Sequence, residues 1–407
     1  MQNLSLYIHI PFCLYRCGYC DFNTYSGIEN LIPDYSLALQ TEIQQLASQN
    51  NAAFPIHSMF FGGGTPSLLP IKALNQLMTC LRDNFAVSRE AEITLEANPG
   101  NLSQPYFEGL RELGFNRLSI GMQSSHPGEL AFLERRHDYL DVIHCFTQAR
   151  NAGFNNINLD LIFGLPEQIM ERWQQSLDLA IGLQPEHFAL YALTIEPGTP
   201  FGGWARRGLL SMPDPDLAAE MYLYASERLI NANYTQYEIS NWAKAEDNLL
   251  LNDSANPALA CQHNLQYWRN LPYLGLGAGA HGYTSGTRTA NVRSPQEYIK
   301  RMMPGKHNRQ VEKRSYPATP ATEDILSIDR NTEIAETMMM GLRLTREGIS
   351  ADTFRHRFDS ELITYFGSQI ERLIEMDLLE WFNNNQTGIR LTPRGRLLGN
   401  QVFGAFL

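Results

Sequence analysis

A chain of 407 residues exceeds the size of most single hydrophobic cores, so we expect a large domain with an appended module. Hydrophobic residues make up 43% and charged residues only 18%, which excludes a disordered chain. The 43 acidic residues outnumber the 32 basic ones, and the net charge of -11 excludes general attraction to nucleic acid or an anionic membrane. No apolar run reaches the roughly 18 residues of a membrane span, and the start shows no basic region before an apolar one. We therefore expect a soluble, cytoplasmic protein.

The first 200 residues alternate short β-rich runs with longer helical patterns, which is typical of parallel strands joined by crossover helices. Helical patterns separate several of these runs: Pro33–Ala47, Ile71–Phe85, Tyr139–Ala152 and Arg172–Leu183. The expected strands are Leu4–His9, His57–Phe61, Glu92–Glu96, Arg117–Ile120, Ile157–Ile162 and Phe188–Leu193. Six such units favour an α/β fold with an incomplete (β/α)6 barrel. An open doubly wound sheet stays an alternative, because strand order cannot be read from one sequence.

The remaining chain reads as an extension over 201–330 and a C-terminal module over 331–407, after a barrel domain over 1–200. The extension includes a helix at Asp216–Ala232 and a polar linker at His307–Arg330. The module combines helical patterns with β-runs at Leu378–Phe382 and Ile389–Thr392, joined by a turn at Asn383–Gly388, which predicts a winged-helix-like α+β element. Its ten acidic and eight basic residues form no basic stripe, so a lid, an interaction surface or a dimer contact is favoured over nucleic-acid binding.

Polar residues and glycines follow five of the expected strands. They are Gly62–Pro66, Glu96 with Asn98 and Pro99, Gln123, Asp160, and Tyr191 with Ala192. Each alone is explained by a tight turn or a helix cap. Because ligand sites in parallel α/β folds form at the carboxyl ends of strands, we expect these residues to share one pocket.

The sharpest motif places Cys13, Cys17 and Cys20 in a C-x3-C-x2-C spacing directly after the first strand. Three thiolates on one loop can hold three corners of a four-iron cluster and leave one iron free for a chelating ligand. The alternative is a structural zinc site in which these cysteines are joined by His9 or a more distant histidine.

This cysteine loop, followed by a glycine-rich second strand, resembles the radical S-adenosylmethionine superfamily. The resemblance implies a [4Fe-4S] cluster whose open iron binds S-adenosylmethionine, and cleavage of that molecule to a 5′-deoxyadenosyl radical. Glycines at 62–64 suit such a site physically, because backbone without Cβ atoms can approach the methionyl end closely.

Within the superfamily the chain is similar to the coproporphyrinogen dehydrogenase branch over nearly its full length. The resemblance implies that Tyr7, Tyr19, Gly63 and Glu96 contact the cluster-bound S-adenosylmethionine. The dehydrogenase binds a second S-adenosylmethionine, and the resemblance leaves open whether this chain does. The positions that correspond to that second site are Gly64, Thr65, Gln123, Arg135, Asp160 and Ala192. The matching segments are Tyr7–Cys13, Gly62–Pro66, Glu96–Pro99, Ser119–Ser124, Asn158–Pro166, Tyr237–Trp242 and Gly275–His281.

Two departures separate the chain from the dehydrogenase itself. The dehydrogenase has a fourth cysteine two residues after the third, where this chain has Phe22. It also has an N-terminal extension that helps form its substrate site, whereas the first motif here begins at Tyr7. Both argue against oxidative decarboxylation of coproporphyrinogen III and leave cluster binding intact.

The segment Cys261–Trp268 resembles the H-N-x-x-Y-W motif of haem chaperones in the same branch. His263 is then the expected haem-iron ligand, and Tyr267 and Trp268 offer flat apolar surface for the macrocycle. The alternative is that His263 bonds a backbone carbonyl while the aromatic rings fill a core. Cys261 is either a second ligand or a small buried residue.

The function that the resemblance implies is that of a haem chaperone with a [4Fe-4S] cluster, S-adenosylmethionine and haem, which passes haem to acceptor proteins such as respiratory enzymes. No catalytic residue is assigned, and a homodimer is left open. The alternative is an oxygen-independent coproporphyrinogen III dehydrogenase. Packing roles are expected for Cys80, Cys145 and Met338–Met340, and no role is assigned to His137.

Overall fold

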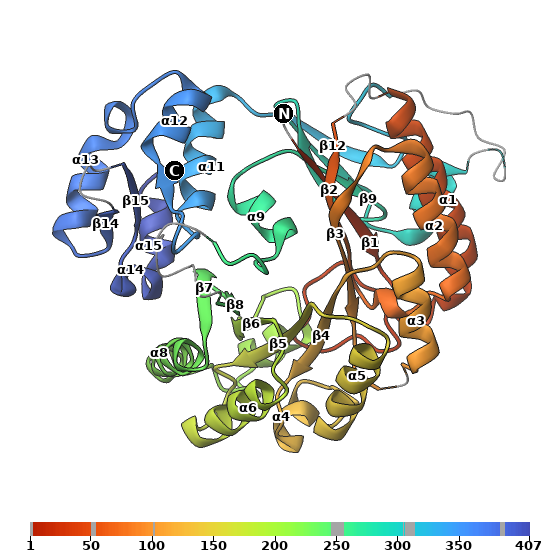
Figure 1. The fold of residues 1–407 in the computed structure, drawn as a ribbon, viewed down its shortest axis with the longest axis horizontal. Coiled ribbons are helices and arrows are strands. Elements are labelled where there is room, and N and C mark those ends of the chain that lie inside the picture. The colour runs from red at the N-terminus through yellow and green to blue at the C-terminus, as the bar shows by residue number, and fades with distance from the viewer. Residues whose placement is uncertain are drawn as a thin grey trace. The chain divides into compact units, whose positions relative to one another are not determined.

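The computed structural model describes residues 3–49, 54–100, 102–245, 256–303, 305, 314–382 and 387–407 (Figure 1). The chain forms two compact units, each discontinuous in sequence. The first unit contains Met1–Glu186, Leu190–Met221 and Pro272–Ser327, and the second contains His187–Ala189, Tyr222–Leu271 and Ile328–Leu407. The three contiguous domains expected from the sequence stay a prediction. No described helix combines the length and hydropathy needed to cross a bilayer.

All six predicted strands are present, each slightly longer than or shifted from its expected range. They are β1 (Leu4–Ile10), β2 (Ile56–Gly63), β3 (Val87–Ala97), β4 (Arg117–Gln123), β5 (Ile157–Phe163) and β6 (His187–Ala192). Strands β1 to β5 pair in parallel and in chain order. A doubly wound sheet would reverse that order at a switch point. The fold is therefore the expected incomplete barrel, and its strands are buried on both faces because helices cover the outside.

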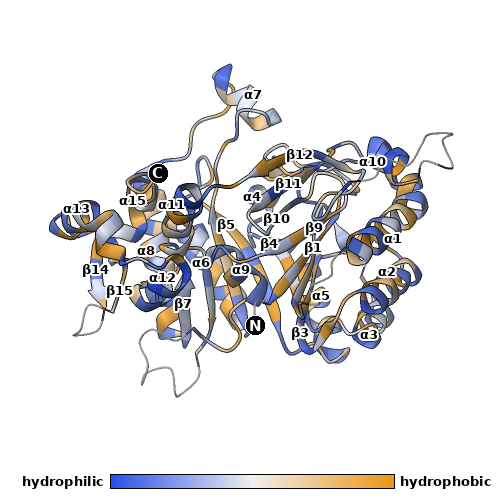
Figure 2. Cartoon of the chain, turned by 90° about the horizontal axis from the view of Figure 1, so that it is seen from above, coloured by the Kyte–Doolittle hydropathy of each residue, from blue (hydrophilic) through white to orange (hydrophobic). Residues whose placement is uncertain are grey.

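The helices between these strands confirm the four predicted patterns. They are α1 (Ile32–Gln49), α2 (Ile71–Asn84), α5 (Tyr139–Asn151) and α6 (Met170–Gly182). In the view of Figure 2, α1 and α2 carry hydrophilic and hydrophobic stripes along their length. Two further helices, α3 (Gln104–Glu112) and α4 (Pro127–Phe132), were not predicted, because nine and six residues are too few to show a clear helical period. Short 3-10 turns lie at Glu29–Leu31 and Pro66–Leu68.

The chain returns to the first unit after residue 271 and adds strands on the far side of β1. Strand β9 (Tyr273–Leu276) pairs in parallel with β1, and β10 (His281–Thr284), β11 (Thr287–Asn291) and β12 (Thr322–Ser327) follow antiparallel. Helix α10 (Pro295–Met302) connects β11 towards β12. The expected linker at 307–330 is corrected in part, because β12 pairs its backbone with β11. Residues 307–313 of that linker lie outside the described residues.

A buried carboxylate joins this returning segment to the first helix. Glu42 of α1 accepts hydrogen bonds from the Gly277 N–H at 2.8 Å and the Tyr298 hydroxyl at 2.7 Å. Its other oxygen accepts from Asn291 Nδ2 at 2.8 Å and from the Thr319 hydroxyl at 3.1 Å. The segment Gly275–His281 is thereby held against the helix that follows the cysteine loop.

The second unit contains a short antiparallel sheet and the C-terminal module. Residues His187–Ala189 of β6 pair with β8 (Asn241–Lys244), which pairs with β7 (Tyr234–Glu238). Helix α8 (Pro215–Asn231), near its predicted bounds, carries the chain between the units, α7 (Pro200–Arg206) precedes it, and α9 (Gln262–Trp268) holds the candidate haem motif.

The C-terminal module has the predicted winged-helix-like order. It runs through α11 (Arg330–Gly341), β13 (Ile349–Ser350), α12 (Ala351–Phe358), α13 (Leu362–Glu375), β14 (Leu379–Phe382), β15 (Gly388–Leu391), α14 (Pro393–Leu397) and α15 (Gly399–Gly404). Its three strands pair in the order β13-β15-β14. Met338 lies fully buried in its core, as expected for a packing residue. The first four residues of the predicted turn, 383–386, lie outside the described residues.

Candidate functional site

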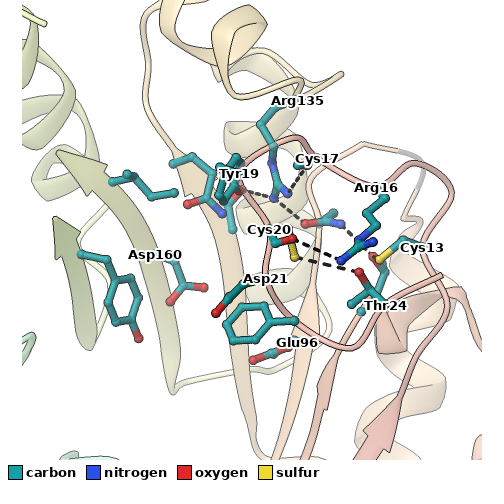
Figure 3. Close-up of a pocket in the computed structure, with 18 of the residues that line it drawn as sticks. Cys13, Arg16, Cys17, Tyr19, Cys20, Asp21, Thr24, Glu96, Arg135 and Asp160 are labelled. Carbon is teal, nitrogen blue, oxygen red and sulfur yellow. Dashed lines mark hydrogen bonds between the residues drawn. The ribbon is translucent and has the colours of Figure 1, made fainter. Parts of the chain in front are cut away.

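A cavity of about 390 Å³ lies at the carboxyl ends of the parallel strands in the first unit (Figure 3). Of the residues predicted to contact S-adenosylmethionine, all except Tyr7 line it: Tyr19, Gly63, Gly64, Thr65, Glu96, Gln123, Arg135, Asp160 and Ala192. Asn98 and Tyr191 line it as well. The expectation that the strand-end residues share one pocket is confirmed for all five strands, although Gly62, Pro66 and Pro99 do not line it. Their individual contacts with a cofactor stay predictions.

The three cysteines line the same cavity and are each half-buried. Each sulfur lies near one polar atom: Cys13 Sγ is 3.8 Å from Thr65 Oγ1, Cys17 Sγ is 3.8 Å from Arg135 Nη1, and Cys20 Sγ is 3.9 Å from Thr24 Oγ1. Burial raises the pKa of the Cys13 and Cys20 thiols. A bound metal would lower such pKa values again, because thiolates are the ligating form.

Backbone hydrogen bonds hold the cysteine loop against the barrel. The Cys13 N–H donates to Tyr25 O at 2.9 Å, and the Thr65 N–H donates to Phe12 O at 2.8 Å. The Gly18 N–H donates to a carboxylate oxygen of Glu134 at 2.6 Å. Sequence reasoning missed Glu134, for which the chain offers no signal beyond its position beside Arg135.

His9 is one expected fourth ligand of the alternative zinc site. Among the described residues, no three His, Cys, Asp or Glu side chains surround one metal-ion position. His9, the proposed fourth zinc ligand, donates from Nε2 to Asn23 O at 2.9 Å and accepts at Nδ1 from the Tyr7 hydroxyl at 3.0 Å. Both ring nitrogens of His9 are thus hydrogen-bonded, and the three thiols face one cavity.

Tyr7 lies on β1, outside the lining of the cavity. Its ring stacks beside Phe60 with the centroids 6.4 Å apart, and its hydroxyl bonds His9. The structure therefore does not bring Tyr7 to the cavity wall with the other predicted contacts. Burial, with a smaller contribution from the nearby charge of Glu96, raises the pKa of its phenol.

Two carboxylates face the cavity from β3 and β5. Burial, reinforced by the charge of Asp160, raises the pKa of Glu96 to about 8. Burial also raises the pKa of Asp160 to about 6, and hydrogen bonds from Asn158 Nδ2 at 2.8 Å and the Ser119 hydroxyl at 3.0 Å limit that rise. The two groups therefore differ in proton affinity, and Glu96 stays largely protonated near neutral pH when no cation is bound.

The glycine run after β2 bends the backbone around the cavity. Gly63 has φ of +111°, and its N–H donates to a Glu96 carboxylate oxygen at 3.1 Å. A Cβ atom at Gly63 would lie 2.4 Å from Cε1 of His9. Glycine is required here for both conformation and space, so the backbone can present its N–H groups to the cavity.

A polar chain continues from the glycine run across the cavity wall. Asn98 Nδ2 donates to Thr65 Oγ1 at 3.0 Å, and Arg135 Nη2 donates to Asn98 Oδ1 at 2.6 Å (Figure 3). Gln123 closes β4 in the left-handed region with φ of 64°. Further charged residues at the wall, Arg16, Asp21 and Glu196, were not predicted, and only the proximity of the first two to the cysteines could have indicated them.

The candidate haem motif lies in the second unit on α9. His263 is 1% exposed, and its Nε2 lies 2.9 Å from the Tyr267 hydroxyl, one helical turn later. Cys261 is fully buried, and its N–H donates to the Tyr237 hydroxyl at 3.2 Å. Trp268 packs half-buried against the hydrophobic cluster formed by Tyr237, Ala243, Ala260, Leu265 and Leu344. The three motif side chains thus share one short helix, which was not predicted from the sequence.

Comparisons with known proteins agree with this arrangement. Residues 7–180 match the radical SAM superfamily, and residues 328–398 match the HemN C-terminal domain. The chain is 37% identical to the heme chaperone HemW of Bacillus subtilis, covering 99% of both chains. It is 38% identical to the heme chaperone HemW of Escherichia coli, covering 73% of this chain and 75% of that one.

Among solved structures, the chain is similar to the coproporphyrinogen III oxidase HemN of Escherichia coli, a radical SAM enzyme. The TM-score is 0.80 at 24% identity, and the match covers 100% of this chain and 90% of HemN. At that identity the likeness supports the fold, an incomplete barrel followed by the C-terminal module.

Proposed function

Because the chain belongs to the HemW family of the radical SAM superfamily, we propose that it is a haem chaperone that holds a [4Fe-4S] cluster and S-adenosylmethionine and transfers bound haem to acceptor haemoproteins. One observation carries the proposal: a three-cysteine cavity in the first unit occurs together with a helix that presents His263, Tyr267 and Trp268 in the second. Acceptors of the respiratory type are the partners that the sequence resemblance suggests.

Cys13, Cys17 and Cys20 would hold the cluster. Their sulfurs line one cavity without surrounding a single point, and the loop that bears them is fastened by Tyr25, Phe12 and Glu134. A [4Fe-4S] cluster supplies single-electron transfer and, with only three cysteine ligands, one open coordination position. The protein's part is to keep three thiolates oriented on a short loop and to limit solvent around them.

S-Adenosylmethionine would occupy the cavity beside these cysteines. Its ammonium group suits the Glu96 carboxylate, whose proton affinity is raised by burial and would fall beside a cation. Its methionyl end suits the backbone of Gly63 and Gly64, which line the cavity and have no side chains of their own. Gln123, Arg135, Asp160 and Ala192 also line the cavity.

Haem would bind at α9, with His263 as the ligand to iron and the Tyr267 and Trp268 rings against the macrocycle. His263 is buried and hydrogen-bonded to Tyr267 in the described chain. That hydrogen bond has to open before Nε2 can coordinate iron. A site that must rearrange to bind also releases its ligand more readily than a rigid one, which suits transfer to a partner.

Anoxic haem titration of the cluster-reconstituted chain, followed by the Soret band, tests this proposal. We expect a saturable spectral change in the wild type and about tenfold weaker binding in His263→Ala. His144→Ala is the matched control, because His144 is exposed on α5 and should leave binding unchanged. A wild type that shows no saturable binding would rule out the chaperone function.

The competing activity is decarboxylation of coproporphyrinogen III. Phe22, which stands where the dehydrogenase has its fourth cysteine, is 65% exposed beside the cavity. Anoxic incubation with coproporphyrinogen, S-adenosylmethionine and a reductant, followed by chromatography, should yield no protoporphyrinogen. Sustained turnover in this assay would make the chain an enzyme first and a haem carrier second.

A further inference from the structure

Two buried nitrogen donors beside the haem motif lack acceptors. Trp268 Nε1 and Arg343 Nε are inaccessible to solvent and form no hydrogen bond with the described residues. The Arg343 guanidinium lies 5.1 Å from the centroid of the Trp268 ring, so the two side chains are neighbours in the second unit. Burying an unpaired donor is costly, which points to an acceptor that the ligand-free chain does not supply.

Aromatic rings fix the orientation of this arginine. Its guanidinium lies 4.6 Å from the centroid of Phe403 as well as 5.1 Å from that of Trp268. Stacked guanidinium groups keep their N–H donors in the plane between the rings, where they are free to bind a planar anion. The geometry therefore presents a fork of donors beside the last residue of α9.

The nearest buried carboxylate is already satisfied by its own turn. Glu238 accepts hydrogen bonds from the Ser240 N–H at 3.2 Å and from Asn241 Nδ2. Glu238 lies near Arg343, because its backbone forms a β-bridge with the neighbouring Leu344. Burial lowers the pKa of Arg343 and the Glu238 charge opposes that shift, yet among the described residues no ion pair joins the Glu238 and Arg343 side chains. Burial raises the pKa of Glu238 to about 7, which limits its repulsion of a second anion near neutral pH.

Resting on the proposed function, we propose that Arg343 and the Trp268 indole N–H bind a propionate carboxylate of haem. Haem carries two propionates, and a carboxylate is the anion that a guanidinium fork recognises best. His263 and Trp268 lie five residues apart on α9, about 7.5 Å along a helix axis. They also differ by about 140° around that axis, so a porphyrin ligated by His263 has to pass the C-terminal end of α9 to bring a carboxylate to Arg343.

A purely structural role for Arg343 is the competing explanation, since the same stacking holds the end of α9. Comparing haem with its dimethyl ester separates the two, because the ester keeps the macrocycle and the iron but has no carboxylate. Both are titrated into the cluster-reconstituted full chain under anoxic conditions. The variants are Arg343→Gln, Trp268→Phe and the control Arg269→Gln, whose arginine forms a bidentate pair with Glu347 at 2.7 and 3.0 Å.

We expect the wild type to bind haem about tenfold more tightly than the ester. Arg343→Gln should weaken haem binding about tenfold and leave the ester unaffected, so that the preference disappears. Trp268→Phe removes the indole N–H together with part of the ring; the lost ring area affects haem and ester alike, so the loss of the N–H should reduce the preference for haem over the ester about threefold. Arg269→Gln should keep the wild-type preference. Melting temperatures show whether each variant is folded. If Arg343→Gln is unfolded, the haem-to-ester preference of Trp268→Phe tests the assignment instead.

Other outcomes overturn the assignment in distinguishable ways. Equal wild-type affinity for haem and ester would show that no propionate is recognised. Equal weakening of haem and ester in Arg343→Gln would make the arginine a structural clamp. Absence of saturable haem binding in the wild type would instead overturn the proposed function, and this assignment with it.

Discussion

Glu96 and Asp160 are the residues whose chemistry depends most on their position in the fold. Both face the cavity, and burial raises the pKa of Glu96 to about 8 and that of Asp160 to about 6. The difference arises because Asp160 accepts hydrogen bonds from Asn158 and Ser119, whereas Glu96 accepts one from the Gly63 N–H. Sequence reasoning identifies both residues as strand-end carboxylates, but their proton affinities follow from the packing around them.

The raised pKa of Glu96 predicts a pH-dependent stability. Its ordinary pKa of 4.5 is lower than the folded value, so the folded state holds the proton more tightly. The resulting stabilisation is present in full below about pH 4.5 and is lost as pH rises through about 8. Glu96→Gln cannot ionise, so between about pH 5 and 8 the wild type should lose about 3 kcal/mol of stability relative to this variant.

Thermal unfolding of cluster-reconstituted protein without S-adenosylmethionine checks this. The melting temperature of the wild type should fall relative to Glu96→Gln by about 2–4 °C over that range. Asp160 is present in both proteins, so its titration contributes to the difference only through its coupling to Glu96. If the difference in melting temperature between the wild type and Glu96→Gln is the same at about pH 5 and about pH 8, Glu96 is not protonated in the folded chain.

At the scale of the element, the end of β2 determines whether the cavity forms. The strand ends at Gly63, whose positive φ turns the chain, and Gly64 then donates its N–H to Ile10 O at 2.9 Å. These bonds place the glycine run against the start of the cysteine loop. The sequence indicates a glycine-rich turn at this place, but not that His9 packs against it.

Gly63→Ala should damage this element. The new Cβ would lie 2.4 Å from Cε1 of His9, and an alanine would have an unfavourable positive φ at this position. We therefore expect about 2–4 kcal/mol of destabilisation and lower cluster occupancy. Iron analysis and thermal unfolding measure both effects. Gly203→Ala in α7 is the control, because a Cβ there meets nothing within 4 Å, and it should be neutral or stabilise by up to about 1 kcal/mol. Full iron content in Gly63→Ala would contradict the role of this turn.

At the scale of the molecule, the two candidate sites lie in separate compact units. Cys13, Cys17 and Cys20 belong to the first unit, whereas α9 belongs to the second. Each site is built on the core of its own unit. Cluster binding and haem binding should therefore be separable by substitution.

We expect the triple variant Cys13→Ser, Cys17→Ser, Cys20→Ser to lose bound iron while keeping its haem affinity within about threefold. His263→Ala should show the reverse, with full iron content and weakened haem binding. Iron analysis and Soret titration on the same preparations check both. Loss of haem binding in the triple variant would show that the cluster organises the haem site as well.

The sequence by itself determined the six strands of the barrel, the cysteine loop, the strand-end residues of the cavity and the aromatic motif at 263–268. These features are local, because each depends on periodicity or spacing within a few residues. Only the tertiary structure decided that Tyr7 lies off the cavity wall, that β9 and β12 extend the sheet beyond β1, and that Arg343 stacks on Trp268. Those relations join segments far apart in the chain, and they follow from burial and pairing that no local pattern records.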